Sequence, residues 1–199
     1  MKLYLAGPDV FRPDAAQWAE HARRLCRQAG HEALIPLDGV ETTAAGIYHA
    51  NIGLIQAADA VLANLNPFRG CEPDSGTCVE VGFALALGKP VTGYLEGTES
   101  TVERVGRVQG GVDVGADGRP RDHEGLLIED FGLPLNLMLA PPCRVVGGGI
   151  DAAIAQLSSI DGLGRVDRCL GGRGLGLGGL ERGLGATHAR PVVVQLLLR

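Results

Sequence analysis

The chain has 199 residues, of which 45% are hydrophobic and 21% are charged, a composition that suits one soluble globular core. Its formal net charge of -5 argues against a nucleic acid or an anionic membrane as the partner, because either would require a clustered basic surface. A small neutral substrate remains compatible with these values.

Short apolar runs alternate with helical patterns along the first half of the chain. The predicted strands are residues 2–7, 31–37, 60–65 and 89–95, and the predicted helices are residues 13–30, 46–59 and 77–88. Repeated strand and helix units of this length predict a mostly parallel α/β sheet that helices cover on both faces. Ligands of such sheets bind outside the carboxyl ends of the strands, so we expect the site there.

The second half begins with a polar, glycine-rich interval. Residues 96–125 are too long for a plain connection, and we expect a mobile flap or an insertion there. Residues 126–140 return to an ordered pattern, and residues 143–159 indicate a final strand and helix. The expected domain therefore covers residues 1–159.

Residues 160–199 have a different character. They are rich in glycine and lack an apolar period, which predicts a flexible tail or sequence outside the evolved domain. They contain a G-x-G-x-x-G pattern at Gly174, Gly176 and Gly179. No predicted strand precedes this pattern and no predicted helix follows it, so we do not expect a dinucleotide site.

The cysteines and the N-terminus indicate a reducing compartment. The five cysteines form no C-x-x-C pair, which suits free thiols better than disulfides or a zinc site: Cys26, Cys71, Cys78, Cys143 and Cys169. The apolar run at the N-terminus is too short for a secretory signal, and a cytoplasmic protein is expected. No feature of the sequence calls for a metal, a flavin or a nicotinamide.

One carboxylate interrupts an apolar stretch. Between Val79 and Leu87, Glu80 is the sole residue that is neither apolar nor glycine. Thr77 and Glu80 have the spacing of a capping box, so a structural role in capping the helix is one interpretation. The other interpretation is chemical, since a partly desolvated carboxylate held by a hydroxyl is a better nucleophile than one in bulk water. The same side chain could serve in both roles.

A second acid precedes Glu80 by six residues. We expect Asp74 on a loop and Glu80 in the first helical turn, both at the ligand edge of the sheet, where Tyr4 also belongs. Two carboxylates facing one cleft suit cleavage of a glycosidic bond, because one can attack the sugar carbon while the other exchanges a proton with the leaving group. Asp74 also fits a partner for the helix dipole, and Gly76 either admits a ligand close to the backbone or makes the turn.

Several motifs together resemble the nucleoside 2-deoxyribosyltransferase family. They occur in the family's order from residue 3 to about residue 158, namely YLAGP, ADAVLANLNPFRG, DSGTCVEVGFALALGKPV, GY and IEDFGLPLNLML. The D-x-G-T-x-x-E block is moderately specific by itself, and with NPFRG before it and LPLNLM after it the match is strong. The resemblance implies a single flavodoxin-like, or Rossmann-like, domain, in agreement with the alternation of strands and helices.

The resemblance also implies a reaction, a double displacement on a 2'-deoxyribonucleoside in nucleoside salvage. A glutamate attacks the anomeric carbon, the base leaves, and a second base or water attacks the deoxyribosyl-enzyme ester. Glu80 matches this nucleophile, Asp74 matches the carboxylate that handles the nucleobase, and Tyr4 matches the tyrosine that holds the nucleophile. Asn136 and Met138 match a segment that a neighbouring subunit contributes near the sugar's hydroxyl groups, so the resemblance implies a homo-oligomer.

The chain departs from the family's pattern at Asn51, where better-known members carry a second aspartate. An amide can hydrogen-bond a base edge but carries no proton at neutral pH, so base preference and the proton path do not transfer from the family. Phe68 either stacks on a base or packs against other side chains of the protein. Arg69 either closes the pocket or is a solvated cation on a loop. Gly7, beside the first strand, is a further candidate for substrate contact.

Two alternatives to the transferase stay open. A nucleoside or nucleotide N-glycoside hydrolase would use the same glutamate and let water finish the reaction. A phosphate-binding site would favour a serine-rich or basic segment at the start of the helix. This helix begins with DSGT, whose acidic residue repels phosphate, so the sequence favours an unphosphorylated nucleoside. The replacement at Asn51 also allows a nucleoside-sensing domain without turnover.

Overall fold

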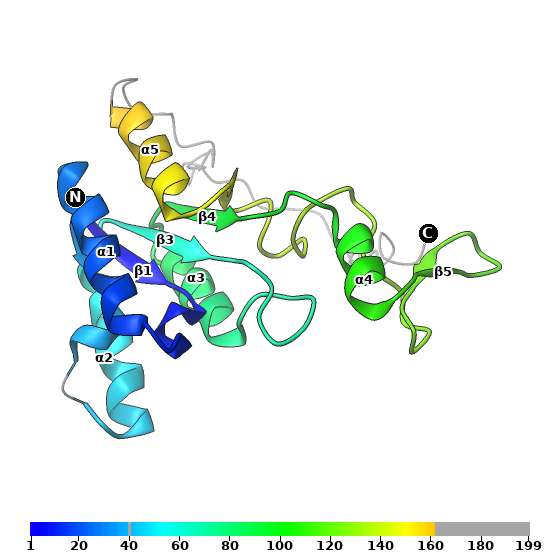
Figure 1. Ribbon diagram of the computed structural model, residues 1–199, viewed down its shortest axis with the longest axis horizontal. Helices are drawn as coiled ribbons and strands as arrows, with labels where there is room; N and C mark the ends of the chain where they lie inside the picture. Colours follow the sequence, from blue (N-terminus) through cyan, green and yellow to red (C-terminus); the bar gives the residue numbers. More distant parts are fainter. Residues whose placement is uncertain (40, 162–199) are drawn as a thin grey trace, which may run out of the picture. The chain divides into compact units, whose positions relative to one another are not determined.

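The computed structural model describes residues 1–39 and 41–161, and it contains a five-stranded parallel sheet in the order β2-β1-β3-β4-β7 (Figure 1). The strands of this sheet are β1 (Lys2–Ala6), β2 (Glu32–Leu34), β3 (Ala60–Asn64), β4 (Val91–Leu95) and β7 (Arg144–Gly147). The α-helices are α1 (Ala15–Gln28), α2 (Ala44–Ala57), α3 (Ser75–Ala86), α4 (Thr101–Gln109) and α5 (Ile150–Asp161). Two 3₁₀ turns, η1 (Pro8–Phe11) and η2 (Pro36–Asp38), follow β1 and β2.

Helices cover both faces of the sheet. On β1, Tyr4 and Ala6 join one buried cluster with residues of α2 and α3, whereas Leu3 and Leu5 join a second cluster with residues of α1 and α5. Side chains of a strand alternate between its faces, so an unbroken apolar run is what a strand buried on both sides requires. The predicted fold class, a parallel α/β sheet between two helical layers, is confirmed.

The second predicted strand is shorter than expected. It ends at Leu34, and Pro36 begins η2 instead of continuing the ladder. Proline lacks the N–H that a paired strand needs and its ring suits the first position of a helical turn. The chain therefore leaves the ladder after Leu34 and continues as η2.

The interval of residues 96–125 contains helix α4, which was not predicted from the sequence. Ser100 and Glu103 form a capping box: the Ser100 hydroxyl accepts from the Glu103 amide, and the Glu103 carboxylate accepts from the Ser100 amide at 2.7 Å. This S-x-x-E signal stands in the sequence, but the polar composition around it obscured it. The interval also holds a short antiparallel pair, β5 (Asp113–Val114) and β6 (Pro120–Arg121).

The predicted boundary at residue 159 stays a prediction. Helix α5 runs to Asp161, and the G-x-G-x-x-G pattern beyond it lies outside the described residues. Among the helices of residues 1–39 and 41–161, none has both the length and the apolar character needed to cross a membrane.

Candidate active site

A cleft of about 440 Å³ opens at the carboxyl ends of the strands, between the loop after β1, the region of η2 and α2, and the start of α3. Five of the predicted site residues line it: Gly7, Asn51, Asp74, Gly76 and Glu80. They come from separate segments of the chain, and the parallel sheet brings these together because its strands all end at one edge.

Tyr4, which does not itself line the cleft, contacts the lining residue Glu80. The Tyr4 hydroxyl, from the fully buried face of β1, donates a 2.6 Å hydrogen bond to Glu80 Oε1. No described residue donates a hydrogen bond to Oε2, the second oxygen of Glu80. Burial raises the pKa of Tyr4 above its ordinary value, and the adjacent Glu80 charge adds to this, so the hydroxyl keeps its proton.

Asp74, and not the predicted pair of Thr77 and Glu80, caps helix α3. The Asp74 Oδ2 atom accepts hydrogen bonds from the Thr77 amide at 2.9 Å and from its hydroxyl at 3.0 Å. The helix begins at Ser75, so Glu80 lies in the second turn and its carboxylate is beyond the first amides. The capping-box interpretation of Thr77 and Glu80 is therefore wrong, and Glu80 has no capping role. Asp74, whose alternative role was a partner for the helix dipole, lies at the N-terminus of α3 as that role requires, and it also lines the cleft.

The ionisation of Glu80 follows from these surroundings. Burial raises the pKa of Glu80 to about 7, the Asp74 charge acts in the same direction, and the Tyr4 hydrogen bond opposes both. A carboxylate poised near neutral pH can accept or release a proton, and when ionised it is only weakly solvated. These are the properties of an acid–base group or a nucleophile.

The loop after β1 is shaped by close backbone packing. A Cβ on Gly7 would lie 2.8 Å from the Asn64 Cβ and 2.9 Å from Asp9 Oδ2, so only glycine fits. Asn64 Nδ2 donates to the same Asp9 oxygen at 2.8 Å, and burial raises the pKa of Asp9. This contact joins the ends of β1 and β3 and holds η1, which supplies part of the cleft wall.

Phe68 and Arg69 do not line the cleft, but they contact a residue that does. Phe11 of η1 lines the cleft, is 59% exposed, and stacks on Phe68 with ring centroids 5.5 Å apart. The Arg69 guanidinium lies over the Phe68 ring at 4.6 Å and over the Phe11 ring at 5.5 Å. The two predicted residues thus support Phe11, which was not selected from the sequence.

Several further lining residues were missed, among them Glu41 and Ile47. These two precede or begin the helix that carries Asn51, and their types are common in any solvated loop or helix. The aromatic residue Phe11, in the turn that follows β1, was a signal that could have been used. Across residues 1–39 and 41–161, no group of three or more His, Cys, Asp or Glu side chains is placed to hold a metal ion.

Asn136 and Met138 lie apart from the cleft in this chain. They line a second cavity of about 390 Å³ together with Cys78 and Val81, which belong to helix α3. Met138 is 71% exposed. The structure of one chain therefore does not bring this pair together with Glu80.

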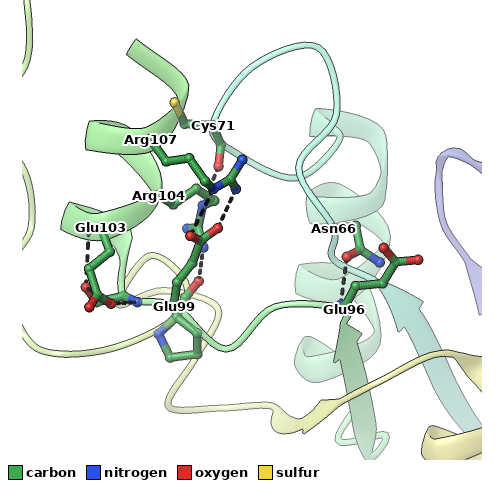
Figure 2. Close-up of polar contacts among 9 residues, drawn as sticks. Asn66, Cys71, Glu96, Glu99, Glu103, Arg104 and Arg107 are labelled. Carbon is green, nitrogen blue, oxygen red and sulfur yellow. Dashed lines mark hydrogen bonds and ion pairs between the residues drawn. The ribbon is translucent and has the colours of Figure 1, made fainter. Parts of the chain in front are cut away.

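A buried arginine anchors the segment that leads to Asn136. Arg104 of α4 is 2% exposed, and it donates from Nε to the Cys71 carbonyl at 2.7 Å and from Nη1 to the Pro134 carbonyl at 2.6 Å. Figure 2 shows this guanidinium reaching the Cys71 carbonyl. The side chain ties the loop before α3 to the segment before Asn136, so both are fixed relative to each other.

Comparisons with known proteins identify relatives of the chain. The family model described as nucleoside 2-deoxyribosyltransferase matches residues 3–138. A solved structure, a 2-desoxiribosyltransferase from Leishmania mexicana, is 38% identical with a TM-score of 0.66, and the match covers 79% of this chain and 97% of that chain. A protein of Schizosaccharomyces pombe described as uncharacterized is 32% identical over 175 residues, which span 77% of this chain and 83% of its own length.

Proposed function

The chain belongs to the nucleoside 2-deoxyribosyltransferase family, and we propose that it transfers the 2-deoxyribosyl group of a 2'-deoxyribonucleoside to a free nucleobase. The observation that carries this proposal is the 2.6 Å hydrogen bond from Tyr4 to Glu80 at the wall of the cleft. It holds one carboxylate oxygen and leaves the other available to a ligand.

Glu80 is the nucleophile of the proposed reaction. Its free oxygen attacks C1' of the bound sugar, the C1'–N bond breaks, and the electron pair leaves with the base, which takes up a proton. The incoming base then attacks C1' of the resulting ester, the C1'–O bond breaks, and Glu80 returns as a carboxylate. The developing positive charge on the sugar is stabilised by the carboxylate throughout.

Asp74 exchanges the proton with the base in this scheme. It lines the same cleft, and the hydrogen bonds that Thr77 donates to Oδ2 hold its carboxylate in one orientation. A fixed acid on the same cleft as the nucleophile is the arrangement that cleavage of a glycosidic bond requires. The Tyr4 hydroxyl stays protonated and orients the nucleophile.

The base lies against Asn51, Phe11 and the loop after β2 in this proposal. Asn51 lines the cleft with an uncharged amide, so it selects a base edge through hydrogen bonds and takes no part in proton transfer. Phe11 offers an exposed aromatic face, and Gly7 and Gly76 admit the ligand close to the backbone.

A neighbouring copy completes the site in the same proposal. Asn136 and Met138 line a different cavity from Glu80, and Met138 is largely exposed. A segment of this kind can reach the sugar of an adjacent subunit, so we propose a homo-oligomer with shared sites, acting in nucleoside salvage in the cytoplasm.

The test is to incubate the protein with 2'-deoxyinosine and adenine and to separate the products by chromatography. Deoxyadenosine is the expected product. Hypoxanthine with free deoxyribose and no deoxyadenosine would indicate a hydrolase, and no change over a panel of donors would indicate a nucleoside sensor; either result contradicts the proposal. Glu80→Ala should lower the rate by on the order of 10³-fold or more, whereas the exposed Glu124→Ala should not change it.

A further inference from the structure

Glu129 forms a two-point contact with the segment that carries Asn136. Its Oε1 atom accepts from Asn136 Nδ2 at 2.8 Å, and its Oε2 atom accepts from the Leu137 amide at 2.9 Å. The contact closes a bend of the chain between residues 129 and 137. Glu129 lies within the IEDFGLPLNLML motif, but the motif gave it no role and it does not line the cleft.

The Asn136 side chain is also bound from its other end. Its Oδ1 atom accepts from the Met138 amide at 2.9 Å, and its own carbonyl accepts from the Leu139 amide at 2.8 Å. Arg104, through the Pro134 carbonyl, holds the chain two residues earlier. Nδ2, Oδ1 and the backbone carbonyl of Asn136 therefore each make a hydrogen bond.

These contacts determine which way the Asn136 amide faces. An ionised carboxylate only accepts hydrogen bonds, and a backbone amide only donates them. Nδ2 must therefore face Glu129 and Oδ1 must face Met138, and the opposite orientation would put donor against donor and acceptor against acceptor. One N–H of Nδ2 binds Glu129, and within residues 1–39 and 41–161 no hydrogen bond uses the second N–H.

We infer that Glu129 is a positioning residue that makes Asn136 a hydrogen-bond donor to a hydroxyl oxygen of the deoxyribose. This inference rests on the proposed function and adds a residue to it. Asn136 is the group that touches the sugar, and Glu129 acts through it. The carboxylate orients the amide, and the Met138 amide, by donating to Oδ1, strengthens the donor character of the remaining N–H.

The experiment compares Glu129→Gln with the exchanged pair Glu129→Gln/Asn136→Asp in the deoxyinosine and adenine assay. The introduced glutamine has one acceptor oxygen where Asn136 Nδ2 and the Leu137 amide both donate, so the single variant disturbs the Asn136 amide. The exchanged pair restores the contact with reversed polarity, since the introduced aspartate accepts from the glutamine NH₂ and from the Met138 amide. The exchanged pair therefore rebuilds the turn but carries no donor for the sugar. Glu124→Gln is the matched loss of an exposed charge.

Each variant is measured for its thermal unfolding midpoint and for kcat/KM with three donors: 2'-deoxyinosine, 2',3'-dideoxyinosine and 2',5'-dideoxyinosine. We expect Glu129→Gln to lower kcat/KM for deoxyinosine about 10- to 100-fold, the loss of a hydrogen bond to an oriented group. We expect the wild type's preference for deoxyinosine over one of the two dideoxy donors to shrink by a similar factor. The exchanged pair should recover the unfolding midpoint without recovering the rate.

Three results would overturn the inference. The first is that Glu129→Gln has the kinetics of the wild type. The second is that Glu129→Gln keeps the full wild-type preference for deoxyinosine over both dideoxy donors. The third is that the exchanged pair recovers the rate as well as the unfolding midpoint, which would make Glu129 structural only. If the exchanged pair does not fold, the donor preference of Glu129→Gln decides by itself, because general damage lowers the rates of all donors equally. Absence of transfer by the wild type would instead refute the proposed function, and this inference would fall with it.

Discussion

Replacing Tyr4 by phenylalanine should move the acid limb of the activity profile to higher pH. The Tyr4 hydroxyl donates a 2.6 Å hydrogen bond to Glu80, and this contact partly offsets the burial that raises the pKa of Glu80, which is about 7 with both effects included. A hydrogen bond to a charged group contributes about 1.5 kcal/mol or more, and one pH unit corresponds to about 1.4 kcal/mol. Tyr4→Phe should therefore raise the pKa of Glu80 by about one pH unit.

The measurement is the rate of transfer from deoxyinosine to adenine between about pH 5 and pH 9. Because the nucleophile must be ionised, the wild-type rate should rise with an apparent pKa near 7, and that of Tyr4→Phe should rise about one pH unit higher. At pH 7 the variant should be several-fold slower, and at high pH the gap should narrow. Superimposable limbs in the two proteins would refute the link between the hydroxyl and the ionisation of Glu80.

Three further outcomes are expected. Because the folded protein holds the Glu80 proton more tightly than the unfolded chain, the free energy of unfolding falls as pH rises from 4.5 to about 7. Glu80→Gln should remove this loss, so urea unfolding should show the variant to be more stable than the wild type by about 2 kcal/mol at pH 8, a figure reduced for the partial exposure of Glu80. At pH 4 the two proteins should be equally stable. Asp74→Asn should keep the helix cap and the thermal unfolding midpoint, because asparagine also caps helices, but it should slow base exchange. It should also shift the acid limb of the pH–rate profile to lower pH, because it removes a charge that raises the pKa of Glu80. An acid limb at the wild-type pH would contradict this. Gly7→Ala should destabilise the fold by about 1 to 3 kcal/mol, because the new Cβ meets Asn64. Gly53→Ala on α2, where the new Cβ meets open space, should stabilise the fold slightly. Equal thermal unfolding midpoints for the two variants would refute the packing argument.

The sequence by itself determined the fold class and the edge of the sheet at which the cleft lies. Leu3, Tyr4 and Leu5 form an unbroken apolar run, which only a strand covered on both faces can bury, and strands of that kind alternate with helices along the chain. The local sequence also singled out Glu80, because burying a carboxylate in an apolar helix costs free energy unless the carboxylate has a partner. The family motifs agree with both conclusions, and the family is confirmed.

Only the tertiary structure decided what each polar side chain contacts. Asp74-x-x-Thr77 and Thr77-x-x-Glu80 are overlapping cap patterns, and the sequence could not choose between them; the helix starts where packing of Val81 and Ala84 against the sheet places it, which frees Glu80 from the cap. Tyr4 and Glu80 are 76 residues apart, and their contact depends on how α3 crosses the end of β1.

The same distinction separates Asn136 from its partner. The N-x-M motif identified the asparagine, but the orientation of its amide follows from Glu129 and from the turn that Arg104 anchors. A side-chain amide is symmetric in outline, so its donor and acceptor ends are assigned by neighbours that folding brings together. Residue identity thus selected the candidate groups, and three-dimensional proximity decided which atoms each of them contacts.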